Sequence, residues 1–313
     1  MAQLYFKYGA MGSSKTANAL MARFNYEERG QKTLLVKPRM DQRDGDHMVH
    51  SRIGLEYPCV YFDEMRALSE DALKENACII VDEAHEGTQT ELGKAVMQEL
   101  TKDQTKILRL SGTPFNLLDD FKEDEIYTWD YVMEQRAKAS WDELHFGDPN
   151  PYASLPTMNI YTYDLGRLLN EFVDEDVAFN FREFFRVNNS GTFVHDKDVS
   201  AFLNLITKED KESCYPFANE EYRNIFRHTL WMLPGVKEAR AMSAMLQTHP
   251  VFQHFKVVNV AGNGDEDEES KDALVAVEEA IGKDPDATRT ITLSCGRLTT
   301  GVSVKAWTAV FML

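Results

Sequence analysis

Short apolar runs separated by amphipathic segments make up the N-terminal part of the chain. Apolar runs of the length of a β-strand lie at residues 4–8, 32–37, 49–54, 59–62, 77–81 and 106–110. Segments with the apolar spacing of a helix lie at residues 16–29, 68–75 and 90–100. Because strands that alternate with helices form parallel sheets, this pattern predicts an α/β domain with helices on both faces of its sheet.

The pattern changes after residue 120 and alternates again near the C-terminus. Residues 123–141 predict one long helix, and residues 158–164 alternate as a strand does. Phenylalanines crowd residues 168–187, which favours a packed core over a platform on which nucleic-acid bases stack. Further strands are predicted at residues 227–233, 255–260, 290–294 and 307–313, and further helices at residues 237–247 and 273–281. This order predicts a second parallel sheet.

Three parts follow from this pattern. They are a first α/β domain at residues 1–120, a mainly helical connecting region at residues 121–226 and a second α/β lobe at residues 227–313. The last predicted strand is apolar and no helix follows it, so its face and its edge would lack cover. The second lobe is therefore expected to be incomplete.

Composition narrows the class of protein. The 313 residues are 43% hydrophobic and 27% charged, which is typical of a soluble globular chain with room for two domains. The sequence has neither an apolar run of about eighteen residues nor a basic region followed by an apolar one at its start, so no membrane partner and a cytoplasmic location are expected. The four cysteines form no C-x-x-C pair, so no structural zinc is expected and free thiols are favoured.

The formal net charge of −17 bears on the question of nucleic-acid binding. Proteins hold phosphate backbones with Lys and Arg, which release counterions on binding. A chain this acidic does not bind nucleic acid by its overall charge. Binding to DNA therefore requires a local basic groove.

The segment between the first predicted strand and helix has the composition of a phosphate-binding loop. It consists of Gly9, Ala10, Met11, Gly12, Ser13, Ser14, Lys15 and Thr16. Small residues let backbone N–H groups surround phosphates, and the following helix adds its partial positive charge. Lys15 is expected to reach the β- and γ-phosphates of ATP, and the Thr16 hydroxyl to bind Mg²⁺. Ser14 stands where the pattern has a second glycine, and a small-residue turn before an ordinary helix is the simpler alternative.

Two predicted strands end in polar residues suited to the same chemistry. Asp82 and Glu83 follow the strand at residues 77–81; Asp82 is expected to hold Mg²⁺, and Glu83 to orient and polarise the attacking nucleophile. The alternative is a helix N-terminus at which acidic residues merely suit the helix dipole. Ser111 and Thr113 follow the strand at residues 106–110, where ligands bind in such sheets, although Ser-Gly-Thr-Pro is also a common turn.

A first resemblance is carried by residues 1–12, 25–30, 41–45 and 51–55. Through these segments, residues 1 to about 75 resemble a bacterial thymidine kinase of the zinc-lasso class. The resemblance implies that Asp41 and Arg43 help to order Mg²⁺ and phosphate, and that Glu83 is the base on the 5′-hydroxyl of thymidine. The paired zinc cysteines and the thymidine-binding lasso of that family have no counterpart in the sequence.

A second resemblance is carried by residues 82–85, 111–113 and 298–302. Through them, residues from about 76 to 313 resemble a superfamily 2 DEAD/DEAH helicase of the kind found in type III restriction subunits. The resemblance implies a P-loop NTPase with two RecA-like parallel-sheet lobes and a helical insertion between them. It places Thr299 and Gly301 at the nucleotide cleft, with ATP as substrate and single- or double-stranded DNA as partner. The sixth helicase motif, which carries the arginine finger, would lie beyond Leu313.

Three functional hypotheses remain open at this point. The favoured one is a Mg²⁺-dependent, helicase-like ATP hydrolase that acts with nucleic acid. The second is a nucleoside kinase that transfers phosphate from ATP to the 5′-hydroxyl of thymidine. The third is a fusion remnant that binds nucleotide but turns over little, because both resemblances meet at the one strand that ends in Asp-Glu-Ala.

Overall fold

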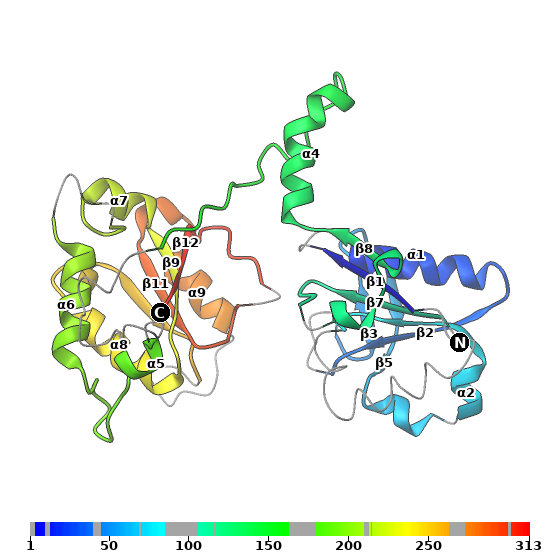
Figure 1. The fold of residues 1–313 in the computed structure, drawn as a ribbon, viewed down its shortest axis with the longest axis horizontal. Helices are drawn as coiled ribbons and strands as arrows, with labels where there is room; N and C mark the ends of the chain where they lie inside the picture. The colour runs from blue at the N-terminus through cyan, green and yellow to red at the C-terminus, as the bar shows by residue number, and fades with distance from the viewer. Residues whose placement is uncertain are drawn as a thin grey trace. The chain divides into compact units, whose positions relative to one another are not determined.

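The computed structural model describes residues 4–9, 13–39, 45–68, 70–84, 106–115, 117–162, 180–209, 213, 215–262, 273–299 and 302–313. The chain divides into two compact units, Met1–Asn159 and Ile160–Leu313, which we call unit 1 and unit 2. Each unit contains its own parallel sheet, so the predicted α/β class with two parallel sheets is confirmed (Figure 1). The predicted three-part division remains a prediction.

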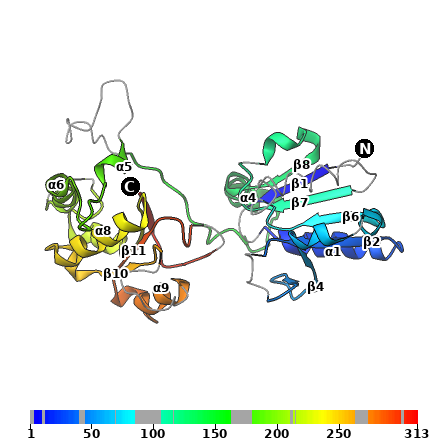
Figure 2. The same ribbon diagram turned by 90° about the horizontal axis from the view of Figure 1, so that it is seen from below.

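Unit 1 is built on a sheet of six strands that all run parallel. In chain order they are β1 (Leu4–Gly9), β2 (Lys32–Lys37), β5 (Val60–Tyr61), β6 (Asn76–Val81), β7 (Lys106–Ser111) and β8 (Ile126–Trp129). Their spatial order is β5-β2-β6-β7-β1-β8, and Figure 2 shows β8, β1, β7, β6 and β2 side by side. Strand β7 therefore separates β1 from β6.

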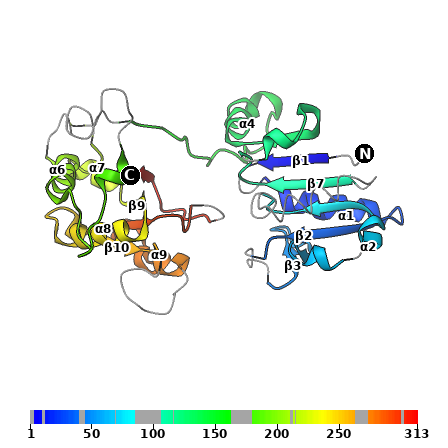
Figure 3. The same cartoon turned by 60° about the horizontal axis from the view of Figure 1, so that its bottom comes forward.

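The strand β6 has side chains in the cores on both faces of this sheet. Ile79 and Val81 pack in one cluster, which also contains residues of the 3-10 helix η1 (Glu64–Ala67) and of helix α2 (Glu70–Lys74). Cys78 and Ile80 pack in the other, which is covered by helix α1 (Lys15–Glu27) (Figure 3). Because successive side chains of a strand point to opposite faces, a continuous apolar run is what a doubly covered strand requires.

One prediction for the rest of unit 1 needs refinement, and another is not tested. The strand expected at residues 49–54 is a hairpin, in which β3 (Met48–His50) pairs antiparallel with β4 (Glu56–Pro58). Residues 51–54 form the turn between them, with Gly54 at a φ of 82°. The helix expected at residues 90–100 lies outside the described residues.

The helix predicted at residues 123–141 is wrong over residues 123–130 and confirmed over residues 131–141. After the 3-10 turn η3 (Glu123–Glu125), the chain forms the edge strand β8 and then helix α4 (Tyr131–Leu144). All four residues of β8 are aromatic or β-branched, which suits a pleated strand. Asp130 then starts α4, because its carboxylate accepts a hydrogen bond from the Met133 N–H at 3.0 Å.

The segment after α4 folds back along that helix. Lys138 Nζ donates to the Leu155 carbonyl at 2.6 Å, and Gln135 Nε2 donates to the Pro156 carbonyl at 2.9 Å. The strand predicted at residues 158–164 is wrong over residues 158–162, which form no strand; residues 163 and 164 lie outside the described part. Within the predicted strand, the Met158 N–H instead donates to the Tyr131 hydroxyl of α4 at 2.6 Å.

Unit 2 contains a sheet of four parallel strands, which confirms the prediction of a second parallel sheet. Its spatial order is β10-β11-β9-β12, formed by β9 (His228–Met232), β10 (Lys256–Asn259), β11 (Thr290–Ser294) and β12 (Ala309–Met312). The helices are α5 (Phe181–Phe184), α6 (Asp196–Thr207), α7 (Glu220–Ile225), α8 (Val236–Thr248) and α9 (Ala273–Ile281). Single 3-10 turns lie at η2 (Leu118–Asp120) in unit 1, and at η4 (Phe252–His254) and η5 (Pro285–Ala287) in unit 2.

The aromatic core of unit 2 tests the prediction that the phenylalanine-rich residues 168–187 form a packed core. Phe184 and Phe185 are buried in a cluster with residues of α6, α8, β9 and β11. For these two residues the prediction of core over stacking platform is confirmed. Phe172 and Phe179 lie outside the described residues.

Three of the four cysteines can be placed. Cys59 and Cys78 are buried and Cys295 is partly buried, all as free thiols, and burial raises the pKa of Cys78 to about 11. Among the described residues, no cluster of three or more His, Cys, Asp or Glu side chains could hold a metal ion. No helix within the described ranges has the length and apolar character that crossing a membrane requires.

Candidate active site

The candidate site lies where three neighbouring strands of unit 1 end. Gly9 ends β1, Ser111 ends β7, and Asp82 directly follows β6. Because these strands are parallel neighbours, their carboxyl ends meet at the same edge of the sheet, which is where ligands bind in open α/β sheets.

The first contact across the site joins Thr16 and Asp82. The Thr16 hydroxyl, in the first turn of α1, donates to Asp82 Oδ2 at 3.0 Å, although the two residues are 66 positions apart. Asp82 is buried, and its Oδ1 accepts a hydrogen bond from the Glu83 N–H at 3.1 Å. A hydroxyl and a carboxylate are oxygen ligands of the kind that Mg²⁺ prefers. The structure thus brings together the two residues of the predicted metal site that it describes.

Lys15 lies over the ends of β1 and β7. Its Nζ donates to the Gly9 carbonyl at 2.8 Å. A Cβ atom added to Gly112 would lie 3.8 Å from the same Nζ, so the lysine passes close to the backbone after β7. A cation in this position is suited to the terminal phosphates of a nucleotide.

Gly9 is required by the packing of the sheet edge. A Cβ atom added there would lie 2.4 Å from the backbone carbonyl oxygen of Trp129 and 2.7 Å from Ser13 Oγ. Trp129 is the register partner of Gly9 on β8, so the close approach follows from strand pairing. Any larger side chain at Gly9 would push β1 and β8 apart.

Ser14, which stands where the phosphate-loop pattern has its second glycine, has the backbone conformation of a glycine. It adopts a φ of 57° and a ψ of 28°, in the left-handed region that favours glycine, and its carbonyl accepts the first hydrogen bond of α1 from the Asn18 N–H at 2.9 Å. The backbone therefore has the conformation expected of a glycine, although the residue is serine.

This geometry predicts that Ser14→Gly stabilises the protein. A residue other than glycine in the left-handed conformation costs roughly 1–2 kcal/mol, which glycine would not pay. Glycine also has more freedom in the unfolded chain, and this cancels about 0.5–1 kcal/mol of the stabilisation. We expect the free energy of unfolding to rise by about 0.5–1 kcal/mol, as measured by urea titration. Ser140→Gly inside α4 is the matched control and should lower it. A loss of stability in Ser14→Gly would contradict the prediction.

Two buried hydroxyls at the site have no hydrogen-bond partner within the described part of the chain, Ser13 Oγ and Thr113 Oγ1. Ser111, by contrast, closes a turn: its Oγ donates to the Thr113 carbonyl at 3.1 Å and accepts from the Thr113 N–H at 3.0 Å. An unpartnered buried hydroxyl costs about 1–3 kcal/mol, which a ligand with phosphate oxygens would offset.

Glu83 is the other strained residue of the site. Its φ is 47°, and its side chain is partly buried. Strain of this kind persists only where the surrounding structure enforces it, and such residues cluster at functional sites. Here the Ala84 N–H donates to the Leu110 carbonyl at 2.8 Å, which ties the chain after Glu83 to the neighbouring strand β7.

Sequence reasoning missed a carboxylate near the site, Glu134 in the first turn of α4. Burial raises the pKa of Glu134, and the positive charge of Lys15 acts in the opposite direction. A single helix over residues 123–141 would place Glu134 in its middle, and so the sequence pattern did not indicate a position near the site. An Asp directly after an aromatic run, with an acidic residue in the turn that follows, could have indicated the start of α4.

The other predicted site residues lie either outside the described residues or in unit 2. Ala10, Met11, Gly12, Asp41 and Gly301 lie outside the described residues. Thr299 belongs to unit 2, where its Oγ1 donates to the Gly296 carbonyl at 2.7 Å. The neighbouring Leu298 has a φ of 60°.

Comparison with known proteins gives two kinds of match. The thymidine kinase family model matches residues 2–106. Thymidine kinase of Salmonella paratyphi A is 40% identical over 89 residues, which is 27% of this chain and 43% of that kinase. Thymidine kinase of Xanthomonas axonopodis pv. citri is 35% identical over 128 residues, which is 39% of this chain and 58% of that kinase.

Longer matches cover more of the chain at lower identity. A Mycoplasma pneumoniae protein described as the C-terminus of a type II restriction enzyme and methyltransferase is 27% identical over 239 residues, 66% of this chain and 32% of that protein. The SWI2/SNF2 ATPase core of Sulfolobus solfataricus in complex with dsDNA covers 98% of this chain and 77% of its own, at 14% identity and a TM-score of 0.29. That score is too low to transfer any feature to this chain.

The chain thus spans only about a third to somewhat over half of the length of these curated relatives. Both expected resemblances are confirmed as similarities, one to thymidine kinases and one to a restriction enzyme and methyltransferase. The match to the thymidine kinase family extends further than expected, to residue 106 rather than to about residue 75, so it includes Asp82 and Glu83.

Proposed function

We propose that unit 1 binds ATP with Mg²⁺ and transfers the terminal phosphoryl group, as a P-loop NTPase does. The observation that carries the proposal is the 3.0 Å hydrogen bond between Thr16 and Asp82. It joins the first turn of α1 to the residue after β6, across the end of β7. A helix dipole would account for acidic residues near a helix start, but not for a threonine and an aspartate that meet from distant parts of the chain.

The proposal gives each residue of the site a role. The backbone N–H groups of residues 9–16 would surround the phosphates, and Lys15 would exchange its bond to the Gly9 carbonyl for the β- and γ-phosphates. Thr16, Asp82 and Asp41 would hold Mg²⁺, which neutralises the charge on the phosphate oxygens.

Glu83 and the residues after β7 would act on the other side of the terminal phosphate. Glu83 would accept a hydrogen bond from the attacking nucleophile and orient it. Ser111 and Thr113 would line the same edge, and the unpartnered Thr113 Oγ1 would donate to a phosphate oxygen. Thr299 and Gly301 of unit 2 would contact the nucleotide in the helicase-like form of the proposal.

The favoured reaction is ATP hydrolysis that acts with nucleic acid, in which water is the nucleophile. It is supported by two successive parallel-sheet units and by the 66% coverage of the chain in the restriction-enzyme match. The second candidate is transfer to the 5′-hydroxyl of thymidine. The family match favours it, because residues 2–106 include the phosphate loop, Asp82 and Glu83. A nucleotide-binding remnant with little turnover is the third.

One experiment ranks the three. ATP consumption is measured with no addition, with thymidine, with single-stranded DNA and with double-stranded DNA, all in the presence of Mg²⁺. Stimulation by DNA supports the hydrolase, and thymidine monophosphate as product supports the kinase. Binding of ATP without turnover in every arm supports the remnant. Absence of ATP binding would overturn the proposal as a whole.

A further inference from the structure

The pairing of β8 with β1 brings the start of helix α4 to the edge of the sheet that holds the candidate site. Trp129, the last residue of β8, is the register partner of Gly9, the last residue of β1. Their backbones are so close that a Cβ atom added to Gly9 would lie 2.4 Å from the Trp129 carbonyl oxygen. Lys15 Nζ donates to the carbonyl of the same Gly9 at 2.8 Å. Trp129 and the Lys15 ammonium group therefore both lie at Gly9.

Glu134 is fixed to this point by its backbone and by its side chain. The Glu134 N–H donates to the Asp130 carbonyl at 3.0 Å, in the first turn of α4. The side chain of Trp129 donates a hydrogen bond to the Glu134 carboxylate, which is partly buried. Burial raises the pKa of Glu134, and the positive charge of Lys15 opposes that rise. The carboxylate is therefore held within the electrostatic reach of Lys15.

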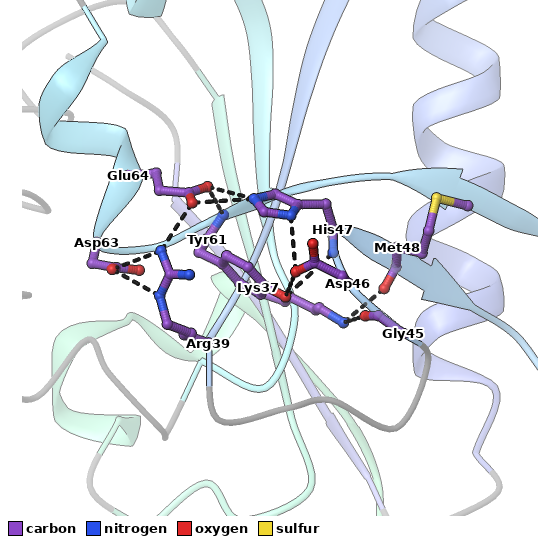
Figure 4. Close-up of polar contacts among 9 residues, drawn as sticks. All are labelled: Lys37, Arg39, Gly45, Asp46, His47, Met48, Tyr61, Asp63 and Glu64. Carbon is purple, nitrogen blue, oxygen red and sulfur yellow. Dashed lines mark hydrogen bonds and ion pairs between the residues drawn. The ribbon is translucent and has the colours of Figure 1, made fainter.

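At the opposite edge of the same sheet, a carboxylate in a similar place is paired with cations. Glu64 follows β5, the other edge strand, and Figure 4 shows it between Arg39 and His47. Its Oε1 accepts a hydrogen bond from Arg39 Nη2 at 2.8 Å, and its Oε2 lies 3.0 Å from His47 Nε2. Within the described part of the chain, Glu134 forms no ion pair of this kind, and the cation that acts on its pKa is Lys15.

A bound triphosphate would take over the cation on which Glu134 depends. In the proposed function, Lys15 leaves the Gly9 carbonyl and contacts the β- and γ-phosphates. Because partly buried charges are screened less than exposed ones, the Glu134 carboxylate would then oppose the phosphates. The negative charge of the triphosphate is greatest without Mg²⁺, so the metal-free nucleotide would be opposed most strongly.

We propose that Glu134 is a specificity-determining residue that makes the site select nucleotide complexed with Mg²⁺ over metal-free nucleotide, by opposing phosphate charge that is not compensated. The inference rests on the proposed function, since it requires that unit 1 bind the phosphates of ATP at Lys15. Helix α4 begins after residue 106, where the match to the thymidine kinase family ends. That match therefore assigns no role to Glu134.

The test measures the affinity of the full chain for ATP, with Mg²⁺ and in EDTA. Glu134→Gln removes the charge, keeps the size of the side chain and can still accept the hydrogen bond from Trp129. It is expected to tighten binding in EDTA about two- to fivefold, the range of partly exposed charge pairs, and binding with Mg²⁺ by less than about twofold. Glu134→Asp keeps the charge, so the ratio of its two affinities should stay closer to that of wild type.

Glu143→Gln is the matched control. Glu143 is an exposed carboxylate in the last turn of the same helix, about 14 Å along the helix axis from Glu134. Its replacement removes the same charge from the chain and should change neither affinity. Thermal unfolding of each variant checks that it is folded.

A series of nucleotides separates selection by charge from a merely structural role. In EDTA, the gain in affinity of Glu134→Gln over wild type is expected to grow from AMP to ADP to ATP, because each phosphate adds negative charge. The gain should also shrink at high salt, which screens the repulsion. A gain that is equal for the three nucleotides would indicate a change in the structure of the site and would overturn the inference.

Two further results would count against a selective role. One is a Glu134→Gln protein that binds ATP as Glu143→Gln does, both with Mg²⁺ and in EDTA. The other is weaker ATP binding in Glu134→Gln, which would show that the carboxylate orients Lys15 instead. If Lys15→Ala abolishes ATP binding while Glu134→Gln leaves it unchanged, only the selection by Glu134 fails. If Lys15→Ala binds ATP as wild type does, the proposed function fails, and the role of Glu134 fails with it.

Discussion

Replacing Lys15 with alanine is expected to abolish measurable ATP binding. Lys15 Nζ lies at the carboxyl edge of the sheet, 2.8 Å from the Gly9 carbonyl and close to the backbone of Gly112. Hydrogen bonds to charged groups contribute about 1.5–3 kcal/mol each, so the loss of contacts to two phosphates should weaken ATP binding by about 100-fold or more. Isothermal titration or a fluorescent ATP analogue measures this directly.

The matched control for this prediction is Lys32→Ala. Lys32 is an exposed lysine at the start of β2 that forms an ion pair with Glu75, far along the strand from the site edge. It should retain wild-type affinity, because exposed ion pairs contribute little. Thermal unfolding of both variants should stay close to wild type. Unchanged ATP affinity in Lys15→Ala would remove the phosphate-loop assignment.

Glu83→Gln is expected to separate binding from turnover. Glutamine keeps the size of the side chain and can accept hydrogen bonds, but it cannot take up a proton from the nucleophile. Positioned acid–base groups contribute about 10²–10⁴-fold, so turnover should fall by about that factor while ATP affinity stays within about threefold. Steady-state ATP consumption and equilibrium binding, measured on the same preparation, give the two values.

Glu75→Gln is the control for Glu83→Gln. Glu75 is exposed and lies before β6, at the opposite end of the strand from Asp82 and Glu83. Its removal should leave turnover unchanged. Equal turnover in Glu83→Gln and wild type would show that another group orients the nucleophile, and Glu134 near Lys15 would be the first residue to replace.

Local patterns along the chain predicted most elements of both sheets. The apolar run at residues 77–81 became β6, because a strand covered on both faces needs apolar side chains in both directions. The strands β9, β10 and β11 and the helices α8 and α9 also lie where the pattern placed them. These elements depend on side-chain periodicity, which the sequence contains in full.

The wrong predictions concern segments whose local sequence pattern was compatible with two different structures. Residues 123–141 contain enough apolar and charged residues for a helix, but residues 126–129 pair with β1 and so form β8. The alternation at residues 158–162 resembles a strand, yet the neighbouring residues 155 and 156 are held against α4 by Lys138 and Gln135. In both places a partner distant in sequence decided the structure, as is common for short β-prone segments.

The sequence alone determined which residues of unit 1 could carry nucleotide chemistry: a loop of small residues before Lys15 and Thr16, and a carboxylate pair after an apolar strand. Only the tertiary structure decided that they meet. The insertion of β7 between β1 and β6 places Thr16 within 3.0 Å of Asp82 and brings Ser111 to the same edge. Strand order arises from pairing between segments that are distant in the sequence, and the periodicity of apolar residues does not predict it.

The tertiary structure also decided two details of backbone. Ser14 takes the left-handed conformation that the sequence pattern assigns to glycine, because the chain must turn there from β1 into α1. His47 takes the same conformation where Glu64 and Lys37 hold the turn after residues 40–44. In each case the surrounding contacts outweigh the local preference of the residue, and so the composition of the segment could not predict its geometry.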